Sequence, residues 1–161
     1  MDASWIVLAN SHHGRIYVRR RGVPFALVET LDHVAARERP RDLVSDRPGV
    51  RNGEGTLLHG NSTVPHTPRD EVEERRFAHL LARRLEKGRT ASDFEQLVLV
   101  MPPRVYGQVF GELDTPTRNT VLLHLGQDLL RLSDVDVEER VLDAMGEPHI
   151  LRPRMRTSSR P

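Results

Sequence analysis

The chain has 161 residues, and its 37% apolar content is enough for one modest hydrophobic core and therefore a single domain. Its 24 basic and 23 acidic residues give a net charge of +1, so no overall field marks it as a nucleic-acid or membrane binder. The absence of cysteine excludes disulfides, thiolate metal sites and cysteine nucleophiles. The sequence has no signal-peptide pattern and no apolar stretch near the roughly 18 residues of a membrane span, so we expect a cytoplasmic protein without membrane insertion.

The first part of the chain predicts a three-stranded antiparallel meander. Residues 5–9 form a continuous apolar run, which is typical of a central strand buried on both faces. A turn cluster separates this run from a short strand at 16–18, and a Gly-Val-Pro turn leads to a third strand at 25–31.

Helices then alternate with strands. We predict a helix that starts at Pro68 and is stopped by Gly88, a strand at 96–101, a proline-opened helix that ends before Thr115, a strand at 121–125 and a final helix between Ser133 and Gly146. The order β-β-β-α-β-α-β-α predicts a mixed five-stranded α/β sheet of order 3-2-1-4-5 with helices on both faces. Ribonuclease-H-like folds and the central domain of class-one release factors have this arrangement.

Residues 1–146 are therefore expected to form one α/β domain, interrupted by a long loop at 37–68 and followed by a basic, disordered tail at 147–161. A loop of this length inside a compact domain indicates either function or disorder. Its arginines are nearly matched by acidic residues, and its glycines lack the lysine of a P-loop, so a phosphate site is not indicated.

Several catalytic readings lack the residues they need. A two-metal nuclease requires carboxylates on its first and fourth strands, and neither 5–9 nor 97–101 contains one. The neighbouring His12 and His13 have no metal-ligand spacing, His33 is expected to be solvated, and His124 is expected to be a satisfied sheet-face residue. The Gly-Gly-Gln loop of release factors is also missing. We therefore predict no metal site, no cofactor and no catalytic residue.

A set of short motifs carries a family resemblance. They are Trp-Ile-Val-Leu-Ala-Asn-Ser at 5–11, Arg-Ile-Tyr at 15–17, Leu-Val-Ser-Asp-Arg-Pro-Gly at 43–49, Arg-Phe-Ala at 76–78, Leu-Val-Leu-Val-Met-Pro-Pro-Arg at 97–104 and Asp-Leu at 128–129. In this order they resemble the bacterial host-attachment protein family, proteins required for attachment to host cells and related to bacterial release-factor-like domains. The family usually has Ala-Asp-Ser where this chain has Ala9, Asn10 and Ser11, so a function of that carboxylate would be lost here.

The resemblance favours a non-catalytic cytoplasmic binding protein that acts on translation or RNA and influences host-cell attachment indirectly. The Ser-Asp-Arg-Pro-Gly turn offers capping oxygens, a guanidinium and a fixed bend, with Phe77 anchoring the loop to the core. The predicted binding residues are Ser45, Asp46, Arg47, Arg51, Arg76 and Asn10. The sequence does not identify the partner, and we consider a ribosome, an RNA or another protein. The alternatives are a hydrolase of RNA or of a peptidyl-tRNA ester, and a homo-oligomeric scaffold that uses the sheet edge at 25–31.

Overall fold

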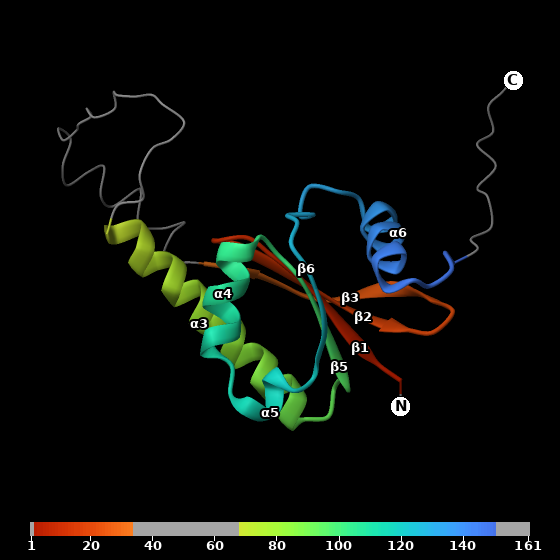
Figure 1. The fold of residues 1–161 in the computed structure, drawn as a ribbon, viewed down its shortest axis with the longest axis horizontal. Coiled ribbons are helices and arrows are strands. Elements are labelled where there is room, and N and C mark those ends of the chain that lie inside the picture. The colour runs from red at the N-terminus through yellow and green to blue at the C-terminus, as the bar shows by residue number, and fades with distance from the viewer. Residues whose placement is uncertain (1, 34–67, 151–161) are drawn as a thin grey trace, which may run out of the picture.

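The computed structural model describes residues 2–33 and 68–150, which form a five-stranded sheet with helices on both faces (Figure 1). The strands are β1 (Ser4–Ala9), β2 (His13–Arg20), β3 (Val23–Asp32), β5 (Gln96–Val100) and β6 (Val121–Leu125). Their order in the sheet is β3-β2-β1-β5-β6, which confirms the predicted order. The first three strands pair antiparallel, β5 pairs parallel with β1, and β6 pairs parallel with β5.

β1 is the centre of the molecule, and all of its residues are buried. Because side chains alternate along a strand, β1 supplies both cores. Trp5, Val7 and Ala9 belong to the core on one face of the sheet. Ile6 and Leu8 belong to the core on the other face. A continuous apolar run is therefore required at this position, as the sequence predicted.

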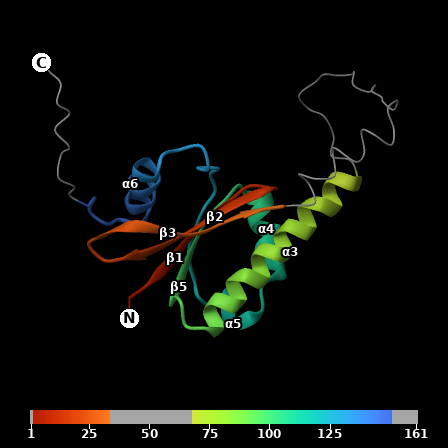
Figure 2. The ribbon, with the colours of Figure 1, turned by 180° about the vertical axis from the view of Figure 1, so that it is seen from behind.

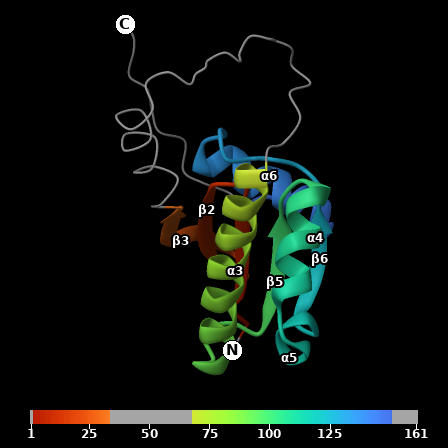
Figure 3. The same ribbon diagram turned by 90° about the vertical axis from the view of Figure 1, so that its left-hand side faces the viewer.

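The helices divide between the two faces. α3 (Pro68–Thr90) and α4 (Pro103–Glu112) lie side by side on one face (Figure 3), and α6 (Asp134–Met145) covers the other. A short helix that was not predicted, α5 (Thr115–Arg118), begins where Asp114 accepts a hydrogen bond from the backbone N–H of Thr117 at 3.0 Å. Among the described residues, no helix has the length and apolar character needed to cross a bilayer.

The prediction that Gly88 ends the first helix is wrong, because α3 continues to Thr90. Gly88 is buried inside the helix, and a Cβ added there would lie 2.6 Å from Cη2 of Trp5. The glycine is therefore needed for a close approach of helix and strand rather than for a helix end. The chain turns afterwards at Ser92, whose φ is 62°.

β3 is an edge strand of the sheet and exposes apolar side chains. Val23, Leu27 and Val28 are 49%, 52% and 41% exposed. Pro24 and two register shifts in the pairing with β2 interrupt this strand, and such irregularities discourage pairing with another edge. The predicted homo-oligomeric use of this edge stays a prediction.

Candidate functional site

The candidate site lies where β1 ends. Figure 2 shows that β1 runs from the amino terminus toward the end of the sheet at which α3 begins. In open α/β sheets, ligands bind outside the carboxyl ends of the strands, where the connections diverge to either side. Here β1 leads to β2 on one side and pairs with β5 on the other. Among the described residues, 10–13 line an open pocket of about 340 Å³ at this place.

Asn10 builds the turn that follows β1. Its side-chain Oδ1 accepts hydrogen bonds from the backbone N–H groups of His12 and His13, both at 2.8 Å. Its own backbone N–H donates to the carbonyl of His13 at 3.0 Å. An aspartate would accept the same bonds, because only an oxygen acceptor is required. The side chain predicted to bind a partner is therefore engaged in fixing the local backbone.

The first turns of α3 bring buried carboxylates to the same end of the sheet. Glu73 contacts Nε2 of His33, and these side chains are only 8% and 9% exposed. The backbone N–H of His33 donates to the carbonyl of His12 at 3.0 Å, which ties β3 to the turn after β1. His33 is thus buried, and the expectation that it is solvated is wrong. A buried carboxylate requires such a partner, because burying an unpaired charge is very costly.

The neighbouring carboxylate, Glu74, links α3 to α4. Arg104 donates to its Oε1 from Nη2 at 3.0 Å and from Nε at 3.3 Å. The Glu74 side chain is 3% exposed, whereas the Arg104 side chain is 51% exposed. Arg76 repeats this pattern: it is 59% exposed and its Nη1 lies 3.8 Å from Oε2 of the buried Glu73. In both pairs, the acid faces inward and the guanidinium faces the solvent.

Histidine side chains form the wall of the pocket. Burial, reinforced by the charges of His13 and His33, lowers the pKa of His12, and Glu74 and Asp70 act weakly in the opposite direction. His12 is therefore uncharged near neutral pH. His13 is more exposed, and its Nδ1 lies 2.6 Å from Oδ1 of Asp32. Within residues 2–33 and 68–150, no group of three or more His, Asp or Glu side chains could hold a metal ion.

The structure places part of the predicted site. Asn10 and Arg76 lie at the same end of the sheet and are connected through Glu73 and His33. The other predicted binding residues, Ser45, Asp46, Arg47 and Arg51, fall outside the described residues. Binding by any of the six residues stays a prediction.

Sequence reasoning missed His33, Glu73, Glu74 and Arg104. A signal for the two carboxylates was present, since Glu73 and Glu74 stand one helical turn before the core residues Phe77 and Ala78 and therefore share their face. His33 and Arg104 gave no comparable signal, because they approach α3 from separate parts of the chain.

Residues 5–141 match the family model described as "Protein required for attachment to host cells". The chain belongs to this host-attachment family. The match covers every described residue of the candidate site. A comparison with curated proteins finds no match to this host-attachment protein.

Solved structures resemble the host-attachment protein at low sequence identity. One is an archaeal translation termination factor, aRF1, with a TM-score of 0.48 and 12% identity over 89% of this chain and 39% of that one. Another is an archaeal protein, with a TM-score of 0.42 and 11% identity over 89% of this chain and 38% of that one. The chain thus spans well under half the length of these proteins.

Proposed function

We propose that this host-attachment protein is a non-catalytic, cytoplasmic RNA-binding protein whose recognition surface is the carboxyl end of β1 together with the first turns of α3 and α4. Attachment would be influenced indirectly, through an RNA or a ribosome that this surface contacts. The observation that supports the proposal is the orientation of the ion pairs at this end. Arg76 and Arg104 are 59% and 51% exposed, whereas their partners Glu73 and Glu74 are 8% and 3% exposed.

An approaching ligand therefore meets the guanidinium groups of Arg76 and Arg104 and the imidazole rings of His12 and His13. The exposed carboxylate of Asp70 lies in the first turn of α3. Guanidinium groups suit phosphate oxygens, because their planar donors can form paired hydrogen bonds. Single-stranded RNA also stacks its bases on flat side chains, and His12 and His13 offer such rings beside the pocket. The net charge of +1 means that recognition must depend on this local surface rather than on a general attraction to nucleic acid.

The same geometry favours binding over catalysis. A general base must reach the proton that it removes, either directly or through one water molecule. Glu73 and Glu74 are buried and directed toward His33 and Arg104. Their charges support the positions of the surface arginines and are not presented to a substrate.

The test is fluorescence anisotropy of a labelled single-stranded RNA with the full chain over a series of salt concentrations. Arg76→Ala and Arg104→Ala should each weaken binding about fivefold and reduce the slope of log affinity against log salt by about 0.7, the value for one lost phosphate contact on single-stranded nucleic acid. Arg20→Ala is the matched control, because it removes an exposed arginine at the opposite end of β2. This variant should bind like the wild type.

Equal affinities for the wild type, Arg76→Ala and Arg104→Ala would contradict the proposed surface. The protein would instead recognise another protein if it had no measurable affinity for RNA and still co-purified with a protein partner from RNase-treated cell extracts.

A second candidate is a hydrolase of RNA or of a peptidyl-tRNA ester, which the lowered pKa of His12 favours because an uncharged imidazole can act as a base. The neighbouring Ser11 lines the same pocket. Turnover of either substrate that His12→Gln abolishes, while RNA affinity is unchanged, would establish this alternative. We expect no turnover.

A further inference from the structure

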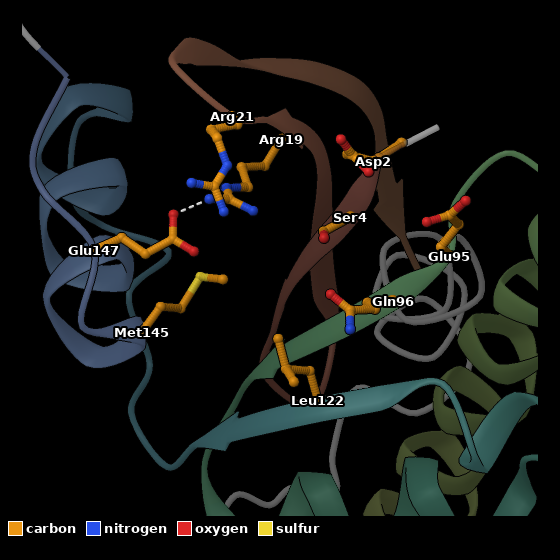
Figure 4. A pocket seen from close by; sticks show the side chains of 10 residues that line it. Asp2, Ser4, Arg19, Arg21, Glu95, Gln96, Leu122, Met145 and Glu147 are labelled. Atoms are coloured by element: carbon orange, nitrogen blue, oxygen red, sulfur yellow. Dashed lines mark hydrogen bonds and ion pairs between the residues drawn. The ribbon is translucent and has the colours of Figure 1, made fainter.

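A second pocket lies at the opposite end of the sheet, where β1 and β5 begin (Figure 4). Its volume is about 310 Å³, near the lower limit of small-molecule sites. Its lining comes from the amino-terminal residues, the ends of several strands and the residues that follow α6. Asp2, Ser4 and Glu147 lie outside the residues 5–141 that match the family model, whereas Arg19 and Arg21 lie inside them.

Arginine side chains form one side of the pocket. The Arg19 side chain is 9% exposed and pairs with Glu147, and Figure 4 shows Arg21 beside it. Burial, followed by the positive charge of Arg21, lowers the pKa of Arg19. Glu147 offsets one of these neighbouring positive charges, and the carboxylate of a ligand could offset the other.

Polar groups lie between the arginines and the far side of the pocket. Ser4 is only 2% exposed, and none of the hydrogen bonds found within the described parts of the chain involves its hydroxyl. Figure 4 shows this hydroxyl directed into the pocket, with the amide of Gln96 next to it. A buried polar group without a partner costs about 1 to 3 kcal/mol, so a ligand oxygen that bonds to Ser4 would remove a local penalty.

Carboxylates occupy the other side of the pocket. Figure 4 shows Asp2 and Glu95 across from the arginines. Arg19 and Glu147 neutralise each other, and Glu95 has a partner of its own. The guanidinium of Arg21 and the carboxylate of Asp2 are the remaining charged groups of the lining. A simple anion would pair with Arg21 alone, whereas a ligand with both a carboxylate and an ammonium group would pair with both charges.

Apolar surface is also present in the lining. Leu122 is 51% exposed, and Met145 lies on the same side of the pocket in Figure 4. We propose that this pocket binds a small zwitterion of the α-amino-acid class with an apolar side chain. Its carboxylate is held by Arg21 and Ser4, its ammonium group lies toward Asp2, and its side chain packs on Leu122.

The test uses L-leucine as the probe and follows the amide NMR spectrum of the isotope-labelled full chain. Isocaproate has the leucine skeleton without the amine, and isoamylamine has it without the carboxylate. L-Leucine should produce saturable shifts at Ser4 and Gln96. Each of the other two compounds should bind at least about tenfold more weakly, because each lacks one charged contact.

A pair of variants distinguishes specific binding in this pocket from a general effect of removing one positive charge. Arg21→Gln should weaken L-leucine binding at least about tenfold. Arg20→Gln removes a neighbouring exposed arginine that does not line this pocket, and it should leave binding unchanged. Shifts that do not saturate, equal binding of all three compounds, or equal losses in the two variants would overturn the proposal.

Discussion

The two ends of the sheet use charge in different ways. At the carboxyl end of β1, the carboxylates of Glu73 and Glu74 are buried and arginine side chains face the solvent. At the amino end the arrangement is reversed, because Arg19 is 9% exposed and its partner Glu147 is 27% exposed. The two ends therefore differ in which partner of the ion pair is buried, the acid at one end and the arginine at the other. The net charge of +1 for the whole chain does not reveal this difference between the two ends.

Removing the buried partner at the carboxyl end should have the largest effect. His33→Ala leaves the Glu73 carboxylate without its buried contact, and we expect the free energy of unfolding to fall by about 3 to 5 kcal/mol in urea titrations. His13→Ala is the control, because it also removes a histidine from a carboxylate, but the His13 side chain is 53% exposed. The control should lose under about 1 kcal/mol. Similar losses in both variants would contradict the distinction between buried and exposed pairs.

High pH should break a hydrogen bond between β2 and the start of α6. Burial, followed by a hydrogen bond to Asp134, raises the pKa of Tyr17 to about 12 from its ordinary value of 10.0. The folded protein therefore keeps this proton more tightly than the unfolded chain. Protonated Tyr17 should therefore add about 2 to 3 kcal/mol to the free energy of unfolding. This stabilisation should be complete below pH 10 and should be lost as the pH rises through 12.

Ultraviolet titration of the tyrosinate absorbance measures this shift. Tyr17→Phe should remove the titration near pH 12. If folded Tyr17 ionised near pH 10 instead, the proposed cause of the alkaline loss would be wrong.

Breaking the pair at the amino end should cost less. Glu147→Ala leaves the charge of Arg19 without its partner, but Glu147 is 27% exposed, so we expect a loss of about 2 kcal/mol in the unfolding free energy. Glu139→Ala, an exposed change on α6, should stay within about 0.5 kcal/mol of the wild type. A loss as large as that of His33→Ala would show that the two ends do not differ as described.

The smallest effect is expected at the turn after β1. Asn10→Ala removes the acceptor for the N–H groups of His12 and His13, which should cost about 1 kcal/mol in thermal unfolding. Asn10→Asp keeps the oxygen and should be nearly neutral, which also tests the aspartate that is usual in the family. A larger loss in Asn10→Asp than in Asn10→Ala would assign the amide nitrogen a role that its contacts do not indicate.

The fold was predictable because its strands and helices depend on local patterns. The apolar run of β1 indicated the central strand, and the capping signals at Ser133 and Gly146 marked both ends of α6. α5 was not predicted, since Thr115 and Pro116 were interpreted only as the end of the preceding helix.

The candidate site was predicted only in part, for a physical reason. A charged residue becomes buried only when distant segments supply its partner, and linear spacing does not reveal that His33 and Arg104 reach Glu73 and Glu74. Local spacing indicates a face of a helix, but it does not indicate what that face meets.

Gly88 has a mechanical consequence. Because Gly88 has no side chain, the ring of Trp5 packs directly against the backbone of α3, and this contact fixes the position of the helix along its axis relative to the sheet. Glu73 lies fifteen residues earlier in the same helix, about 22 Å away along its axis at 1.5 Å per residue. A side chain at position 88 that lifted or slid the helix would therefore also displace the charges beside His33, so the alignment of one end of the molecule depends on a contact made at the other.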